Sequence, residues 1–336
     1  MSATLPSSAM LRAADRSEGV WLSAWRRFKS DRVGLVSLAI VIAFLLLIAL
    51  SALGLVAGNW QREVGVPYAN PTFLGPTPPP PAAQIEEGKG PPVDISTVDP
   101  LAPRYAEWAE RASKLKVDEE VRDNTLPLGG DRLGRDVLAK AIKGAEISIF
   151  VGVLAALLAT AIGTALGAVS GFLGGRVGDL LEWVYNVFTS IPGILLIFAF
   201  AAVFGRGTGT VVLILGLTGW TGIYRLVRAE FLKHAVRDYV RAAEAIGASV
   251  GSRMFRHILP NVSHVVLVQL SILTVGFIKA EVILSYLGLG VSIDQVSWGT
   301  MLAESQVELL LGHWWQLATA TVFMAVFVTA FSLFTD

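Results

Sequence analysis

The segment Asp238–Pro260 reads DYVRAAEAIGASVGSRMFRHILP, and it lies between two long apolar runs. Its charged side chains would be costly to bury in hydrocarbon, so the segment does not cross a membrane. Apolar residues recur at helical spacing in its first part, and Gly247 follows where a residue with positive φ often ends a helix. Ser249 is suited to cap a second helix, which Pro260 would end. The segment therefore predicts a helix–turn–helix.

Each of the two helices is expected to have one apolar face, with residues at i, i+3, i+4 and i+7. The residues of these faces are Tyr239, Ala242, Ala243 and Ile246 in the first helix, and Gly251, Met254, Phe255 and Ile258 in the second. Several of these side chains are small, which allows the surface of another protein to approach closely. We therefore interpret the segment as a docking element.

The composition of the chain is that of an integral membrane protein. Hydrophobic residues make up 53% of its 336 residues and charged residues 16%, against about 25% charged residues in soluble domains. The net charge is +0 and no basic block is interleaved with aromatic residues, so we expect no nucleic-acid partner. The chain has no cysteine, which excludes disulfides and thiolate sites. Its four histidines are scattered over the sequence, so we expect no metal site: His234, His257, His264 and His313.

Six runs are long and apolar enough to cross a bilayer as helices. They are Val33–Val56, Ile147–Gly175, Trp183–Gly205, Gly207–Tyr224, a run from near Asn261 to Gly290, and Trp314–Thr335. Lysine and arginine concentrate in the N-terminal arm and in the loop after the fourth run, which indicates that both are cytosolic. An even number of spans then puts both termini in the cytosol. The sequence thus predicts an all-α integral membrane protein with six transmembrane helices.

The predicted organisation has four parts. They are a cytosolic arm (1–32), a first transmembrane helix (33–56), a long external insert with an interfacial helix (57–146), and a five-helix core (147–336) that includes the coupling loop 225–262. Prolines 76–81 favour extended chain, and Arg104–Arg122 has mixed charge at helical spacing. In Asp131–Asp136 we expect Asp131 to be an N-cap and Arg132 to pair with Asp136 in an interfacial helix. The insert is either a surface for an external partner or a lid.

Lys279 and Glu281 are the only charges that the sequence suggests deep within a span. At i and i+2 they point about 160° apart on a helix, so each needs its own partner or water. They either line the translocation pathway or pair with another subunit. Pro192, followed by Gly193, predicts a kink in the third span, which is typical of pathways but also of ordinary packed helices.

The segment Asp238–Pro260 resembles the EAA loop of ABC importer permeases, through Arg241-Ala242-Ala243, Gly247 and His257-Ile258-Leu259-Pro260. Arg241 stands where the general pattern has glutamate, and His257 where it has isoleucine. Two more strings resemble the C-type permeases of the dipeptide, oligopeptide and nickel branch: LPLGGDRLGRDVL (Leu126–Leu138) and SYLGLGVSIDQVSWGTMLAE (Ser285–Glu304). Glu281 matches an acidic residue expected in that branch, whereas Lys279 is a departure.

This resemblance implies the ABC importer permease fold and half of a translocation pore in a bacterial cytoplasmic (inner) membrane. The implied partners are a second, related permease in a heterodimer, two ABC ATPase subunits and an external substrate-binding protein. The residues that would couple to the ATPases are Tyr239, Arg241, Ala242, Ala243, Glu244, Gly247, His257 and Pro260. The chain has no G-x-x-x-x-G-K-[ST] loop, so we expect ATP and Mg on the ATPase subunits. We expect no catalytic residue and no cofactor in this chain.

The substrate class stays open, because peptides, nickel chelates and some sugars share this permease type. Two functions of other classes also remain. A secondary transporter needs no ATPase, but it would leave the docking element unexplained and would normally have internal repeats. A membrane scaffold would act through the external insert.

Overall fold

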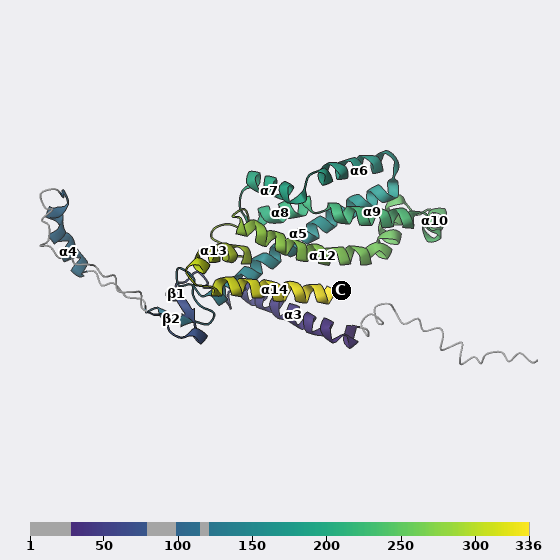
Figure 1. The fold of residues 1–336 in the computed structure, drawn as a ribbon. Coiled ribbons are helices and arrows are strands. Elements are labelled where there is room, and N and C mark those ends of the chain that lie inside the picture. Colours follow the sequence, from purple (N-terminus) through teal and green to yellow (C-terminus); the bar gives the residue numbers. More distant parts are fainter. Residues whose placement is uncertain (1–27, 79–98, 115–120, 336) are drawn as a thin grey trace, which may run out of the picture. The chain divides into compact units, whose positions relative to one another are not determined.

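The computed structural model of the protein describes residues 28–78, 99–114 and 121–335. The chain divides into two compact units. The helical unit consists of the described parts of Met1–Trp60 and Ala139–Asp336, and the insert unit of those of Gln61–Leu138. In the helical unit, α3 runs beside α14, and α12 lies against both α14 and α9 (Figure 1).

The described part of the helical unit is almost entirely helical. Its helices are α3 (Arg32–Ala52), α5 (Val137–Leu173, whose first two residues belong to the insert unit), α6 (Gly175–Ser190), α7 (Gly193–Phe204), α8 (Thr208–Thr218), α9 (Thr221–Ala235), α10 (Asp238–Ala245), α11 (Val250–Ser252), the π-helix η3 (Arg253–Ile258), α12 (Leu259–Tyr286), α13 (Trp298–Leu310) and α14 (Trp315–Thr335).

Among the described residues, five helical stretches are long and apolar enough to cross a membrane. They are Arg32–Ala52, Val137–Leu173, Thr208–Ala235, Val250–Tyr286 and Trp315–Thr335. The pair α6 and α7 makes a sixth candidate if the two are counted as one span, and these helices meet at an angle of 85°. The break lies at Pro192, which is the N-cap residue of α7. The predicted kink is therefore confirmed, and the bend amounts to a broken helix.

Glycines allow α5 to pack closely on its neighbours. Gly163, Gly167 and Gly171 recur every four residues and face α9. A β-carbon at Gly167 would lie 2.7 Å from the carbonyl oxygen of Tyr224, and one at Gly171 would lie 2.5 Å from that of Arg228. Small residues at this spacing bring membrane helices into backbone contact. The glycines of α5 thus set the distance between α5 and α9.

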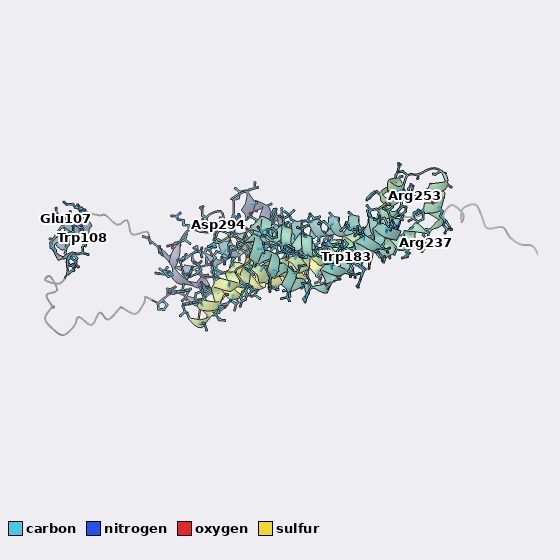
Figure 2. All side chains as sticks on the ribbon, turned by 90° about the horizontal axis from the view of Figure 1, so that it is seen from above. Glu107, Trp108, Trp183, Arg237, Arg253 and Asp294 are labelled. Atoms are coloured by element: carbon cyan, nitrogen blue, oxygen red, sulfur yellow. The ribbon has the colours of Figure 1, made fainter. Side chains whose placement is uncertain are left out.

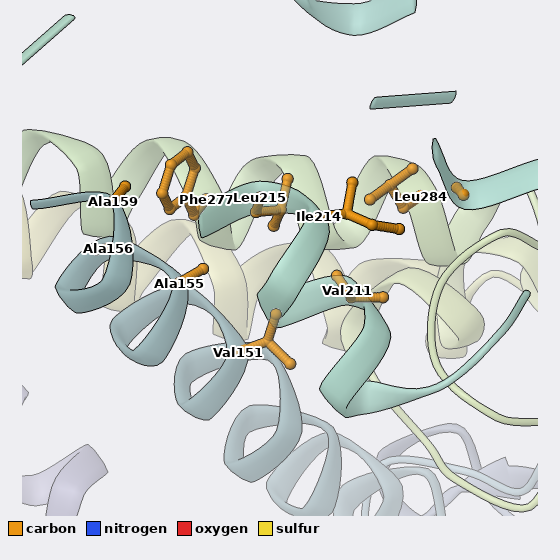
Figure 3. Packing of buried hydrophobic residues seen from close by; sticks show 10 residues of the cluster. Val151, Ala155, Ala156, Ala159, Val211, Ile214, Leu215, Phe277 and Leu284 are labelled. Carbon is orange, nitrogen blue, oxygen red and sulfur yellow. The ribbon is translucent and has the colours of Figure 1, made fainter. Parts of the chain in front are cut away.

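One apolar cluster of the helical unit joins α5, α7, α8 and α12. Val151, Ala155 and Ala159 of α5 come together with Leu215 of α8 and Phe277 of α12 (Figure 3). Many large apolar side chains lie outside this cluster and are exposed, in agreement with helices that face lipid. The number of long apolar helices and the exposed apolar surface both indicate a membrane protein.

The helix bounds differ from the predicted spans at the ends. The second long helix begins at Val137 rather than Ile147, because Asp136 caps it: the Asp136 Oδ1 accepts a hydrogen bond of 2.9 Å from the Leu138 amide. The fourth continues beyond Tyr224 to Ala235. Hydropathy alone misses such extensions, since charged residues at helix ends reach water or bind other helices.

The insert unit corrects the all-α prediction. Strand β1 (Gly65–Pro71) pairs in parallel with β2 (Asp123–Leu126), with Gly65 opposite Asp123 and Pro71 opposite Leu126. Two short helical turns, η1 (Thr72–Leu74) and η2 (Ala102–Arg104), and the helix α4 (Tyr105–Lys114) complete the described part. The mixed-charge helix expected over Arg104–Arg122 is thus present as α4, whereas Arg122 lies outside it, and prolines 79–81 lie outside the described residues.

The segment Asp131–Asp136 forms a turn and not the predicted interfacial helix. The Asp131 Oδ1 accepts hydrogen bonds of 2.9 Å from the amides of Leu133 and Arg135. Its other oxygen lies 2.7 Å from the Arg135 guanidinium. A buried aspartate that bonds the amides two and four residues ahead holds the chain in a turn. Asp131 therefore caps this turn, and the N-cap of the following helix is Asp136.

Candidate functional site

The predicted helix–turn–helix is present, and we call Asp238–Ile258 the α10–η3 hairpin. Gly247 has a φ of 87°, and its amide donates a hydrogen bond of 2.9 Å to the Glu244 carbonyl. A β-carbon at Gly247 would meet no atom within 4 Å, so the backbone angle alone demands glycine. Ser249 caps the second helix through a bond of 3.3 Å from the Ser252 amide. The two predictions for Gly247 and Ser249 are confirmed.

The inner side of the hairpin differs from the predicted apolar faces. Val240 and Ala243 are buried in α10, and Met254 and Ile258 in η3. Val240, Met254 and Ile258 pack against the end of α5 and against α9 and α12, in a cluster that also includes Ala168, Ile223, Val227, Phe231 and Val262. The remaining predicted residues are exposed: Tyr239, Ala242, Ile246, Gly251 and Phe255. The periodicity located both helices, and on the predicted face of α10 it grouped three exposed residues with the buried Ala243.

An ion pair joins the two arms of the hairpin, and two further contacts join the hairpin to α5 and α9. The Arg253 Nη1 lies 2.6 Å from the Glu244 Oε1, and the same guanidinium lies 5.4 Å from the ring centre of Phe172 at the end of α5. The Tyr239 hydroxyl lies 2.9 Å from the His234 Nδ1 of α9. Burial raises the pKa of Tyr239, against the opposing effects of Asn261 and Arg237. The phenol is therefore protonated at neutral pH.

The sequence predicts that the second helix of the hairpin ends at Pro260, but the structure does not bear this out. The helix continues through η3 into α12, and the Leu259 amide donates to the carbonyl of Met254, five residues earlier. Proline lacks an amide hydrogen and clashes with a carbonyl in a regular α-helix. The wider π-turn accommodates Pro260 directly after it. The second helix of the hairpin and α12 thus form one continuous helix, Val250–Tyr286.

The structure brings the eight predicted coupling residues together in and beside the hairpin. Ala243 is buried, His257 is half-buried, and the others are exposed: Tyr239, Arg241, Ala242, Glu244, Gly247 and Pro260. Ile246 at 85% and Phe255 at 55% are exposed apolar side chains on the same element. Arg237 and Arg253 lie at one end of the helical unit, and Asp294 lies at the other (Figure 2). The hairpin therefore offers an apolar and charged surface at one end of the bundle.

Lys279 and Glu281 lie in α12 and do not meet, as their spacing predicts. Lys279 is exposed, whereas Glu281 is fully buried. The Glu281 Oε1 accepts a hydrogen bond of 2.6 Å from Ser285, one turn later in α12. Its Oε2 has no hydrogen-bond partner within the described part of the chain. A carboxylate enclosed in this way can position the surrounding helices, while Lys279 alone of the two is accessible.

The structure has a buried polar cluster near the start of α5 that the sequence analysis did not predict. Lys140 is fully buried, and its Nζ lies 2.5 Å from the Glu304 Oε2 of α13 and 3.1 Å from the Gln316 Oε1 of α14. The Gln316 amide donates to Glu304 and to the Met301 carbonyl, each at 3.1 Å. Lys279 and Glu281 are thus not the only charges deep in the bundle. Asp136 is the residue from which the sequence could have predicted this cluster, because an N-cap at Asp136 extends the helix over Lys140.

A second polar cluster joins α5, α6 and α9. The Arg228 Nε lies 3.1 Å from both the Glu182 Oε2 and the Ser170 Oγ. The Tyr224 hydroxyl lies 3.0 Å from the same serine oxygen. The sequence interpretation treated Arg228 only as a basic loop residue, since it ended the fourth span at Tyr224. Over residues 28–78, 99–114 and 121–335, no three histidine, aspartate or glutamate side chains gather as metal ligands.

Two family models match the sequence. Residues 163–336 match the binding-protein-dependent transport system inner membrane component, and residues 19–70 match the N-terminal transmembrane domain of oligopeptide transport permease C. The first match covers the α10–η3 hairpin, the buried Glu281 and the Glu304–Gln316 cluster. The second covers α3 and β1 except for the last residue of that strand, Pro71.

Relatives of known name are similar over much of their length. The dipeptide transport system permease protein DppC of Bacillus subtilis is 36% identical over 66% of this chain and 71% of its own length. The DppC protein of Lactococcus lactis is 28% identical over 93% of this chain and 87% of its own length. The oligopeptide permease OppC of Salmonella typhimurium is 36% identical over 62% and 68%.

A solved structure of the MetNI methionine ABC transporter, in inward-facing conformations, is also similar. It is 16% identical with a TM-score of 0.42, over 56% of this chain and 96% of that one. The family models and the relatives lead to one assignment. The chain belongs to the binding-protein-dependent transport system inner membrane components, the permeases of ABC importers, in the branch that holds the dipeptide and oligopeptide permeases.

Proposed function

We propose that this chain is the permease subunit of an ATP-driven peptide importer and forms one half of its translocation pathway. Its partners are a second, related permease, two ABC ATPase subunits and an external substrate-binding protein. ATP and Mg bind to the ATPase subunits, and this chain carries no cofactor and no catalytic residue. The names of its relatives support peptides as the substrate class.

In the proposed topology the chain crosses a bacterial inner membrane six times, with α6 and α7 as one broken span. Residues 1–32 and the loop 225–262 are cytosolic, and so is the C-terminal end. The first transmembrane helix lies within 33–56, the insert 57–146 is external, and 147–336 form the core. The basic residues of the N-terminal arm and of the loop 225–262 support this orientation.

One observation carries the proposed coupling, namely that the hairpin and a long membrane helix are continuous. Val250–Tyr286 is one helix, so a force on the hairpin acts directly on α12. The buried Val240, Met254 and Ile258 fix the hairpin to α9 and to the end of α5. A well-packed element of this kind moves as a rigid body. The hairpin is therefore suited to transmit a movement, and not to absorb it.

The mechanism follows from this rigidity. When the two ATPase subunits close on ATP, they shift the exposed face of the hairpin, with Arg241, Ile246 and Phe255 at the contact. The hairpin carries α9 and α12 with it and rocks the spans between an outward-open and an inward-open state. We assign Tyr239, Ala242, Ala243, Glu244, Gly247, His257 and Pro260 to the same coupling element.

Within the spans we propose that Lys279 and Pro192 belong to the pathway. Lys279 is exposed on α12, and the break at Pro192 separates α6 from α7. Glu281 is buried, so its role is to position α12 and not to contact the substrate. Lys279→Met should then lower uptake per assembled complex. Unchanged uptake would remove Lys279 from the pathway.

The energy source tests the function directly. The chain is reconstituted into vesicles with its partner permease, the ATPases and the binding protein, and uptake of a labelled dipeptide is measured. Uptake should require ATP and should persist when an ionophore collapses the proton gradient. Uptake that follows the proton gradient without ATP would contradict the proposal and would identify a secondary transporter.

Two isoleucines at opposite ends of the helical unit test the topology. Ile293 is 86% exposed and Ile246 is 85% exposed, and the chain has no cysteine. A membrane-impermeant thiol reagent should label Ile293→Cys in intact cells, and Ile246→Cys only after the membrane is opened. Labelling of Ile246→Cys in intact cells would overturn the orientation.

A further inference from the structure

A groove of about 650 Å³ lies between the first part of α3 and the last part of α14. Two aromatic contacts establish that these helices are antiparallel. The Phe28 and Phe334 rings meet edge to face at 6.1 Å, and further along the pair Phe44 and Phe327 lie 5.3 Å apart. The groove therefore begins at the end of the membrane span where α3 starts.

Small side chains make this groove hollow. Ser37 of α3 and Ala330 of α14 are buried, at 3% and 4% exposure, and Ala325 and Thr329 also line it. Val36, which is 61% exposed, lines it as well. The groove runs along α3 from residue 32 to residue 40, which is about 12 Å of helix. Apart from one end, its lining suits a hydrocarbon chain.

That one end carries a positive charge. Arg32 lines the groove and is exposed, in the first turn of α3. The neighbouring Asp31 is engaged as the N-cap, since its Oδ1 accepts a hydrogen bond of 3.0 Å from the Val33 amide. The sequence has Arg26, Arg27 and Lys29 directly before this helix. A cation at a helix end with more basic residues beside it attracts anionic lipid headgroups.

We propose that this groove binds one anionic phospholipid, with an acyl chain along α3 and α14 and the phosphate at Arg32. A guanidinium is well suited to the phosphate because it donates two parallel hydrogen bonds. The apolar lining and the terminal charge match the two parts of such a lipid. The site rests on α3 and α14 being membrane helices, and it does not depend on the coupling mechanism or on the substrate.

The headgroup arm of the test uses the purified, assembled complex and native mass spectrometry. The complex is titrated with phosphatidylglycerol or with phosphatidylcholine of the same acyl chains. Arg32→Gln should weaken phosphatidylglycerol binding about fivefold, the effect of one cation near the headgroups, and should weaken phosphatidylcholine binding less, because the choline of that lipid opposes the charge of its phosphate. Arg32→Lys keeps the charge but not the two parallel hydrogen bonds, so its binding should lie between wild type and Arg32→Gln. The exposed Arg176→Gln serves as the control. Equal binding to wild type and Arg32→Gln would overturn the proposal.

The groove arm of the test fills the cavity. Ala325→Phe should abolish retention of the lipid, whereas Val322→Phe, at an exposed position of α14 outside the groove, should not. If the partner permease occupies the groove instead, Ala325→Phe will reduce the yield of assembled complex while bound phosphatidylglycerol per complex stays constant. That result would also overturn the proposal.

Discussion

The two ends of α5 are held by different kinds of interaction. Near its start, Lys140 is fully buried and binds Glu304 and Gln316 on two other helices. Near its end, Ala168 and Phe172 make apolar contacts with the α10–η3 hairpin, much of which remains exposed. Ser170 beside them binds Arg228, and the side chains of Arg228 and its partner Glu182 are 33% and 37% exposed. A buried charge is strongly destabilising when one of its partners is lost. The contacts near the end of α5, in contrast, leave the outer surface of the hairpin accessible. One end is therefore a fixed clamp, and the other presents an accessible surface, which is the proposed docking element.

The largest effect is expected at the clamp. Lys140→Met removes a buried cation and strands Glu304, which should destabilise the protein by about 3 kcal/mol. We use the low end of that range because the Glu304 side chain is 32% exposed. The measurement is the fraction of folded protein in detergent after a temperature series.

Two further variants make this test specific. Lys143 pairs with Glu146 at 2.8 Å but is 24% exposed, so Lys143→Met should cost less than about 1 kcal/mol. The double variant Lys140→Met with Glu304→Met removes both charges and should recover much of the lost stability. If Lys140→Met were as stable as wild type, the cluster would not be a clamp.

The next effect concerns the helix contact between the two ends. Gly167→Val would put side-chain atoms against the Tyr224 backbone, where even a β-carbon would lie 2.7 Å from an oxygen. Overpacking of this kind costs about 1–3 kcal/mol. Gly276→Val in α12 is the matched control, because no atom lies within 4 Å of a β-carbon at that position. Equal thermal stability of the two variants would mean that α5 and α9 are not held at this distance.

The sequence predicted what depends on neighbouring residues. Gly247 ends α10 with positive φ and Ser249 caps the next helix, because both effects act within a few residues. Pro192 breaks a helix for the same reason. The resemblance of three short strings also identified the family correctly, since it relies on residue order and not on contacts.

The sequence could not predict what depends on distant partners. Lys140 is buried only because Glu304 and Gln316, 164 and 176 residues away, bind it. The strands β1 and β2 pair across a long insertion and lack alternating apolar residues, so no periodicity marked them. The π-turn before Pro260 adjusts the helix around a proline that local rules assign to a helix end.

The smallest effect is expected for the ion pair of the hairpin. Glu244→Ala removes the partner of Arg253, but the Glu244 side chain is 61% exposed. Such a pair contributes up to about 1 kcal/mol, and less at high salt. A double-mutant cycle with Arg253→Met, with thermal stability as the readout, isolates the pair from the contact between Arg253 and Phe172. A coupling above 2 kcal/mol would mean that the hairpin end is clamped like the other.

The central claim is that the hairpin transmits the movement of the ATPase subunits to the spans. The variant Gly247→Val tests this claim most directly. A β-branched residue at a φ of 87° is strained by about 1–2 kcal/mol or more. The variant complex in vesicles should therefore hydrolyse ATP but import about tenfold less dipeptide per ATP. The exposed, helical Gly251→Ala is the control and should match wild type. Wild-type import per ATP in Gly247→Val would contradict the account.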